Sequence, residues 1–189
     1  IDTKDIKLKS LREAIGIVSQ SVFLFDGTVR ENITYGRPDI SEEELNYVID
    51  MARLRSVIDK LPMGVDTKIG EHGGKLSGGQ RQRISIARAV LMDPSILIFD
   101  EATAAVDSET EHLIQDAIDR LIEGKTTLMI AHRLSTLRRA NRIIVVDGGK
   151  IIENGSPEEL MALKGKYYKL VQIQSMTADA ERMREEERL

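Results

Sequence analysis

The amino-acid sequence predicts an α/β fold with a parallel sheet. Three short runs are strongly apolar, at residues 96–99, 127–131 and 142–146, and such unbroken runs are typical of strands buried on both faces of a parallel sheet. Helical patterns alternate with these strands along the chain, which is the order expected of an α/β domain. With 189 residues, 41% of them hydrophobic, the chain can form one globular domain or a large part of one.

The N-terminal segment is expected to contain a strand, a loop and a helix. Residues 13–20 have the pattern of a strand that runs into a loop, and an apolar patch follows at 23–25. A helix is predicted to begin at Ser41, because Ser41 and Glu44 form a capping box. The apolar residues that then fall at helical spacing are Leu45, Val48, Ile49 and Ala52.

The middle of the chain is expected to hold a longer helix. Glycines between residues 70 and 79 break regular structure, and a helix is predicted to begin at Ser77 or Gly78. Its apolar positions continue to about Met92, and Pro94 supports an end at that point.

The C-terminal half is expected to contain two more helices and a hairpin. One helix is opened by a capping box of Ser108 with Glu111. Residues 146–152 have the pattern of a hairpin with a tight glycine turn, and residues 156–159 begin a helix with proline at its first position. The tail from 176 to 189 is helical in propensity and mostly charged.

Composition excludes several classes of protein. The net charge of -4 argues against nucleic acid as the main partner, and the lack of cysteine excludes a disulfide scaffold or a cysteine-ligated metal site. No apolar run approaches the roughly 20 residues that cross a bilayer. The chain begins at Ile1 without a methionine or a signal peptide, which is expected of a fragment or a processed chain.

The segment LSGGQ at residues 76–80 is the first candidate for chemistry. Two adjacent glycines at a helix N-terminus expose backbone N–H groups, and a serine hydroxyl adds a further donor, so the segment can bind an anion. The alternative is a flexible glycine loop in front of a helix.

The second candidate is a pair of carboxylates, Asp100 and Glu101, directly after the apolar run at 96–99. Ligands of open α/β sheets gather at the carboxyl ends of strands. Two neighbouring carboxylates can divide the work there, one toward a metal ion and the other toward a nucleophilic water. The alternative is a solvated acidic turn after a core strand.

In order and spelling, these motifs resemble the nucleotide-binding domain of ATP-binding-cassette (ABC) transporters. LSGGQ matches the signature motif of that family letter for letter, and the resemblance continues to about Val171. It implies a P-loop NTPase-like fold with a RecA-like parallel sheet and a helical signature subdomain at about 37–92. The implied organisation is a partial domain over 1–175 and a helical tail over 176–189.

The resemblance also implies roles for single residues. Asp100 would hold Mg²⁺ through water, and Glu101 would polarise the attacking water. His132 would reach the γ-phosphate of ATP, Gln20 would sense Mg²⁺ and water, and Asp107 would communicate across a dimer. Taken alone, His132 is more often structural and Gln20 is unremarkable. The signature residues that would complete a nucleotide site of a partner domain are Leu76, Ser77, Gly78, Gly79 and Gln80.

Two further stretches, at 30–36 and 61–67, resemble exporters whose membrane and ATPase domains share one polypeptide. Glu71, just before the signature, matches the exporter loop that touches the membrane domain. The resemblance therefore implies a transmembrane domain and a second nucleotide-binding domain as partners, no nucleic acid, and a place at the cytoplasmic face of the membrane. The alternative for Glu71 is a solvated loop charge.

A phosphate-binding loop of the form G-x-x-x-x-G-K-[ST] is missing from these residues. The stretch Gly124 to Thr127 has Asp119 where the first glycine would stand, and it leads into a strand instead of leaving one. The family places this loop N-terminal to Ile1, so we expect the chain to bind ATP poorly by itself. We also expect the runs at 127–131 and 142–146 to lack a pairing partner.

Three functions remain in competition. The first is an ATP hydrolase, with ATP and Mg²⁺, that powers export; whether the exported molecule is a drug, a lipid or a peptide stays open. The second is a non-transport ATPase of the same superfamily, but those have a long coiled-coil insertion for which the stretch from Gln20 to Ser77 leaves no room. The third is an inactive module for binding or dimerisation.

Overall fold

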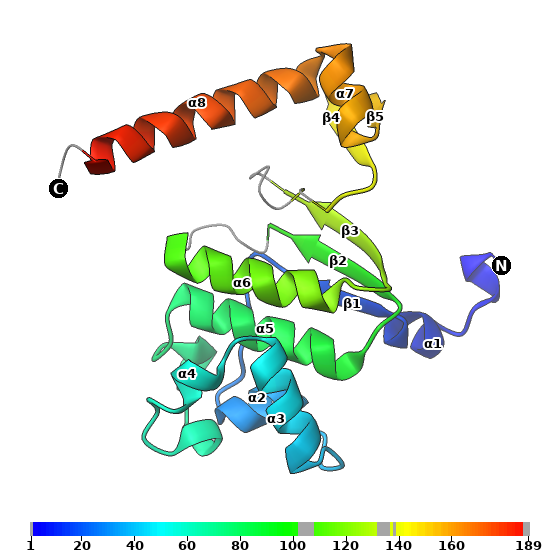
Figure 1. The fold of residues 1–189 in the computed structure, drawn as a ribbon. Helices are drawn as coiled ribbons and strands as arrows, with labels where there is room; N and C mark the ends of the chain where they lie inside the picture. The colour runs from blue at the N-terminus through cyan, green and yellow to red at the C-terminus, as the bar shows by residue number, and fades with distance from the viewer. Residues whose placement is uncertain (1, 102–107, 132–136, 138, 187–189) are drawn as a thin grey trace. The chain divides into compact units, whose positions relative to one another are not determined.

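The structure is a computed structural model that describes residues 2–101, 108–131, 137 and 139–186 (Figure 1). The chain divides into two compact units, Ile1–Ile130 and Ala131–Leu189. Among the described residues, no helix is both long enough and apolar enough to cross a membrane.

A parallel sheet forms the centre of the first unit. It consists of β1 (Ile15–Val18), β2 (Ile96–Asp100) and β3 (Thr126–Ile130), in that spatial order. The pairing is parallel throughout, so the predicted sheet is confirmed for these strands. The expectation that the run at 127–131 lacks a partner is wrong, because β3 pairs with β2 along its whole length.

One face of this sheet is buried and the other is largely open. Val18, Leu97 and Phe99 are at most 1% exposed, whereas Ile17 and Leu128 are 60% and 56% exposed. Side chains of a strand alternate between its faces, so the exposed residues belong to a single face. The prediction of strands buried on both faces is therefore correct for one face only.

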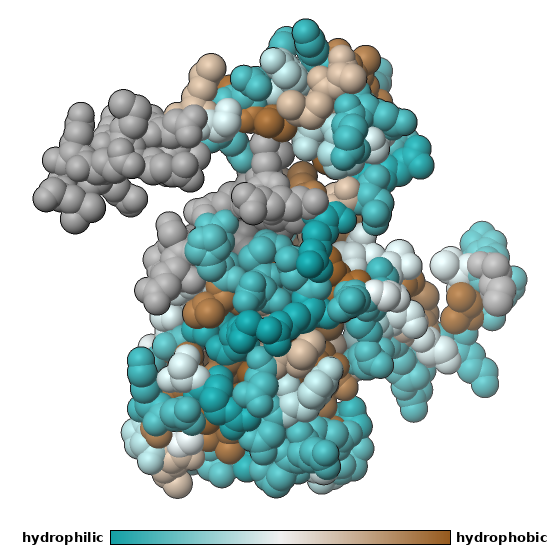
Figure 2. All heavy atoms as spheres, viewed as in Figure 1, coloured by the Kyte–Doolittle hydropathy of each residue, from teal (hydrophilic) through white to brown (hydrophobic). Residues whose placement is uncertain are grey.

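Two helices, α5 (Gly78–Met92) and α6 (Ser108–Leu121), lie side by side over the buried face (Figure 1). Large side chains that are less than 2% exposed fill this core: Leu24, Ile33, Leu45, Ile49, Ile84, Ile86, Leu97, Phe99, Ile114 and Ile118. Burying one side chain of this size stabilises the fold by about 1.5 to 3 kcal/mol. Hydrophilic side chains cover much of the first unit in the view of Figure 2.

Short helices occupy the segment between β1 and α5. They are α2 (Val29–Thr34), α3 (Glu42–Met51), α4 (Arg55–Ile58) and two 3₁₀ helices, η2 (Gly64–Asp66) and η3 (Glu71–Gly73). The predicted cap of α3 is confirmed: the Ser41 hydroxyl accepts a hydrogen bond from Glu44 N–H, and the Glu44 carboxylate accepts one from Ser41 N–H.

At the N-terminus, η1 (Thr3–Asp5) and α1 (Leu8–Glu13) precede β1. Sequence patterns predicted neither of them. Both are short, and neither contains a buried residue, so no apolar period marks them.

The second unit contains an antiparallel hairpin and two helices. Its strands are β4 (Ile143–Asp147) and β5 (Lys150–Gly155), followed by α7 (Pro157–Leu163) and α8 (Lys166–Glu186). The predicted hairpin is confirmed, with positive φ at Gly148 and Gly149 as a tight turn requires. The run at 142–146 was expected in the parallel sheet without a partner; instead it pairs with the next strand.

Candidate functional site

Gln20 and Glu101 meet at the carboxyl ends of two neighbouring strands. Gln20 follows β1 by two residues, Asp100 is the last residue of β2, and Glu101 comes next. Because β1 and β2 are adjacent and parallel, their ends share one edge of the sheet. The Gln20 side-chain N–H donates to a Glu101 carboxylate oxygen at 2.9 Å. Two residues that are 81 positions apart are thereby brought into contact.

The backbone at Glu101 turns sharply at the end of β2. Its φ is 48°, in the left-handed region that costs a non-glycine residue roughly 1 to 2 kcal/mol. Its N–H donates to the carbonyl oxygen of Ile130 at 3.0 Å, which ties the end of β2 to the end of β3. The Glu101 side chain is half-buried, whereas Asp100 is exposed. The turn therefore leaves the Asp100 carboxylate in solvent and places the Glu101 carboxylate against Gln20.

The N-terminus of α5 is built by a capping box. The Ser77 hydroxyl accepts from Gln80 N–H at 3.3 Å, and the Gln80 side-chain oxygen accepts from Ser77 N–H at 3.0 Å. The N–H groups of the first helical residues, Gly78 and Gly79, point out of the helix start without an intrahelical acceptor. The Ser77 hydroxyl can still donate its own hydrogen. This end of α5 is thus a suitable site for an anion.

Among the described residues, none gives Gly78 a steric reason to be glycine. A Cβ at this position would meet nothing closer than 3.9 Å, and its φ is not in the left-handed region. Close approach by a molecule from outside the chain would supply that reason. Leu76, in contrast, is buried in the core, and Arg81 donates to its carbonyl oxygen at 2.6 Å.

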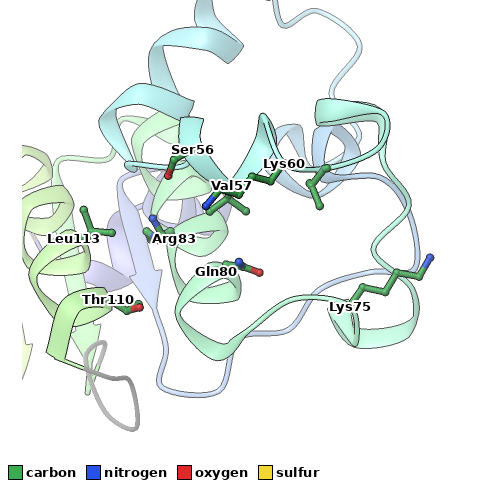
Figure 3. Close-up of a pocket in the computed structure, with 9 residues that line it drawn as sticks. Ser56, Val57, Lys60, Lys75, Gln80, Arg83, Thr110 and Leu113 are labelled. Atoms are coloured by element: carbon green, nitrogen blue, oxygen red, sulfur yellow. The ribbon is translucent and has the colours of Figure 1, made fainter.

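A hollow of about 340 Å³ adjoins the start of α5, and Figure 3 shows Gln80 beside it. Its lining consists of Ser56, Val57, Lys60, Leu61, Lys75, Gln80, Arg83, Thr110 and Leu113. The charged residues of this lining are all cationic. The buried Arg83 donates to the carbonyl oxygen of Arg53 at 2.6 Å. The signature end of α5 therefore lies in surroundings that favour anions.

Sequence reasoning missed a polar pair, the buried Asn32 and the half-buried Arg88. Asn32 is fully buried; it accepts from Phe25 N–H at 2.9 Å and donates to the Phe25 carbonyl oxygen at 3.0 Å. Arg88 donates to both the backbone and side-chain oxygens of Asn32, and to the carbonyl oxygen of Phe23 at 2.7 Å. Burial lowers the pKa of Arg88. The available signal was an arginine within the apolar period of α5.

Beside this pair lies an aromatic patch of Phe23, Phe25, Tyr35 and His72. Ring centroids of neighbouring members are 5.1 to 5.4 Å apart in edge-on contacts. The Phe23 and Tyr35 side chains are 56% and 63% exposed. The Arg88 guanidinium lies over the Tyr35 ring at 5.2 Å. Aromatic side chains are enriched at protein interfaces.

The predicted residues therefore fall into three groups. Gln20 and Glu101 touch each other next to Asp100, and the signature residues lie at the start of α5 with the Leu76 side chain buried. His132 and Asp107 lie outside the described residues. Asp100 and Gln20 offer the oxygen ligands that Mg²⁺ prefers. Within the described residues, no cluster of three metal-ligating side chains occurs. A metal ion held here would need further ligands, which triphosphate oxygens and water can provide.

Comparison with known proteins identifies the family. Residues 1–104 match the ABC transporter family. The chain is 51% identical over 178 residues to the ATP-dependent lipid A-core flippase of Neisseria meningitidis serogroup B, covering 94% of this chain and 29% of the flippase. It is 46% identical over 190 residues to ABC transporter B family member 21 of Arabidopsis thaliana, covering 100% of this chain and 15% of that protein.

A solved structure of a bacterial Atm1-family ABC exporter with ATP bound has the same fold, with a TM-score of 0.82 and 41% identity. The match covers 91% of this chain and 30% of the exporter. The chain therefore spans less than a third of the proteins it resembles. The sequence, the parallel sheet and the signature helix agree with one another: this chain belongs to the ABC transporter family and has its ATPase fold.

Proposed function

We propose that this chain is part of the ATP-hydrolysing domain of an ABC exporter. The observation that carries the proposal is the contact between Gln20 and Glu101 beside Asp100, at the sheet edge where ligands of α/β folds bind. The names of the relatives support it, since they include ATP-dependent flippases and an exporter with ATP bound.

In this function the carboxylates divide the chemistry. Asp100 would hold Mg²⁺ through water, and the metal ion would supply positive charge to offset that of the phosphates. Glu101 accepts a hydrogen bond from the attacking water and orients it. Gln20 already contacts Glu101, so it can exchange that contact for the metal ion or the water. His132 at the γ-phosphate and Asp107 at a dimer contact complete the proposal.

A second nucleotide-binding domain would use the start of α5. Ser77, Gly78 and Gly79 present donors toward a phosphate group that is held mainly by the partner domain. The cationic hollow beside Gln80 favours the same charge. We therefore assign these signature residues to ATP bound by the partner.

The transmembrane domain would dock on the aromatic patch. Glu71 and His72 are exposed in η3, and His72 contacts Phe23. Phe23, a member of this patch, lies in the same segment after β1 as Gln20. The chain then acts at the cytoplasmic face of a membrane although it has no membrane-spanning helix among its described residues.

The non-transport alternative is not favoured by the structure. Every residue between Gln20 and Ser77 is described, and the longest helix there is α3, with 10 residues. No coiled coil is inserted in this segment. The inactive-module alternative predicts that the full-length protein binds ATP without turnover.

The test is Glu101→Gln in the full-length transporter. The amide keeps the shape but removes the charge that orients water, so ATP binding should remain and hydrolysis should fall at least about a hundredfold, or about 2.7 kcal/mol. Phosphate release in detergent or nanodiscs measures it. Glu43→Gln, an exposed residue of α3 far along the chain from the site, is the control and should retain full activity. Near-normal hydrolysis by Glu101→Gln would remove Glu101 from this role.

A further inference from the structure

Helix α5 holds the loop after β1 at two points. The side-chain N–H of Gln82 donates to the carbonyl oxygen of Ser19 at 3.3 Å, and Arg88 donates to that of Phe23 at 2.7 Å. Gln82 is only 5% exposed, so the donor side of this contact is largely protected from water. Gln20 lies between the two anchored carbonyls, with its side chain on Glu101.

The contact of Gln82 fixes more than one atom of the loop. The carbonyl of Ser19 and the N–H of Gln20 belong to the same planar peptide unit. Holding the Ser19 oxygen therefore fixes the direction in which the Gln20 backbone leaves that unit. The hydrogen bond to Glu101 then restricts the conformation of the Gln20 side chain.

Gln82 also lies close to the signature. It is five residues after Ser77, about 7.5 Å along the axis of the same helix. A continuous helix moves as a unit over such a distance. A displacement of the signature end of α5 is therefore transmitted to the Ser19 carbonyl.

We propose that Gln82 is a positioning residue that couples the signature end of α5 to the Gln20–Glu101 pair. It holds the Ser19–Gln20 peptide, so engagement of Ser77 and its neighbours with one nucleotide alters how Gln20 and Glu101 meet at the other. The coupling role rests on the proposed ATPase function. The positioning of the loop does not.

The first experiment measures the loop itself. Gln82→Met keeps length and volume but removes the donor, so backbone hydrogen exchange in residues 19–25 of the full-length protein should become about fivefold faster, the effect of losing one hydrogen bond. Gln115→Met is the matched control: Gln115 is a half-buried residue of α6 that donates to Asp119, and its loss should leave the loop unchanged. Unaltered exchange in Gln82→Met would overturn the proposal.

The second experiment measures coupling. Gln82→Met should lower kcat for ATP hydrolysis about fivefold with KM for ATP within about twofold, because the ground-state phosphate contacts are untouched. In a Gln20→Ala background the same change should lower kcat by less than about twofold, since Gln82 acts through Gln20. An equal loss in both backgrounds would show a merely structural role and overturn the proposal.

A second variant, Gln82→Glu, tests the same contact independently, in case Gln82→Met fails to fold. Gln82→Glu keeps the shape but places a carboxylate against the Ser19 carbonyl, so it should loosen the loop at least as much as Gln82→Met; a loop as protected as in the wild type contradicts the proposal. If the wild-type transporter does not hydrolyse ATP, the proposed function fails, and the exchange measurement still decides whether Gln82 positions the loop.

Discussion

At the scale of single residues, Arg88 shows how a half-buried charge organises a loop. Its guanidinium is partly withdrawn from water, and it has three oxygen acceptors on Asn32 and Phe23 and two aromatic neighbours. Burial lowers its pKa, but an arginine stays protonated at neutral pH because its pKa is so far above 7. The charge is therefore retained and compensated by fixed dipoles of the loop.

Arg88→Met should lower the free energy of unfolding by about 2 to 4 kcal/mol, since three acceptors lose their donor at once. Urea denaturation of the 189-residue chain, followed by circular dichroism, measures the change. Arg120→Met removes an exposed arginine of α6 and should change stability by less than about 0.5 kcal/mol. A loss in Arg88→Met as small as that of the control would contradict this account.

Glu71 carries a prediction about coupling to the membrane. Glu71→Ala in the full-length transporter should leave the basal rate of hydrolysis within about twofold, because Glu71 is exposed and lies in η3, outside the segments that carry Gln20 and Glu101. The same change should weaken the stimulation of hydrolysis by the exported molecule. The ratio of stimulated to basal phosphate release is the measurement, with Glu43→Ala as control. An unchanged ratio returns Glu71 to the role of a solvated charge.

Motif spelling alone is sufficient to predict Gln20, Asp100, Glu101 and the signature as candidate site residues. It could not predict Asn32 and Arg88, because their hydrogen bonds join residues 56 positions apart and no local pattern marks such a pair. Only the folded chain shows that a polar side chain inside an apolar helix face has a partner.

At the scale of elements, two helices begin with the same kind of capping box, but we expect only one of the two caps to matter for ATP hydrolysis. Ser41 and Ser77 begin α3 and α5 with the same reciprocal hydrogen bonds. Ser41→Ala and Ser77→Ala should each lower the free energy of unfolding by about 1 kcal/mol. Only Ser77→Ala should also slow ATP hydrolysis by the transporter, because in the proposed function only the Ser77 hydroxyl would face a nucleotide. Paired thermal melts and phosphate release measure both effects, and equal hydrolysis by the two variants would exclude a nucleotide contact for Ser77.

Elements were predictable where they carry a cap or an apolar period. The beginnings of α3, α5 and α7 follow from such signals, and α2 was missed although Thr28 and Glu31 form a capping box as well. Burial of the strands on both faces was predicted wrongly, because apolar residues such as Ile17 and Leu128 indicate a strand but cannot show what covers it.

At the scale of the whole molecule, the 189 residues contain the signature and the residues that we propose for metal and water, but no G-x-x-x-x-G-K-[ST] loop. Such a loop supplies most of the phosphate contacts in P-loop enzymes. The chain by itself should therefore bind Mg-ATP more weakly than about 100 µM in titration calorimetry. A dissociation constant in the low micromolar range would mean that other groups hold the phosphates. The full-length transporter, which should bind tightly, is the control.

The apolar character of the strands could not by itself predict which of them join the parallel sheet. Residues 143–146 are as apolar as residues 96–99, yet they belong to β4 of an antiparallel hairpin. Strand pairing depends on what lies beside a strand in space. The tight glycine turn at 148 and 149 was the local signal that favoured pairing with β5.

Paired strands of the parallel sheet lie far apart in the sequence, so they are synthesised at different times. Ile15 pairs with Ile96, so β1 leaves the ribosome long before its neighbour exists. At about 5 to 20 residues per second, β1 waits roughly 4 to 16 s for β2. During that interval α2 and α3 can already form from local contacts, whereas Gln20 has no Glu101 to meet. The contact between Gln20 and Glu101 can therefore form only after residue 101 has been synthesised, and a pause in translation before residue 96 would leave β1 exposed to chaperones for longer.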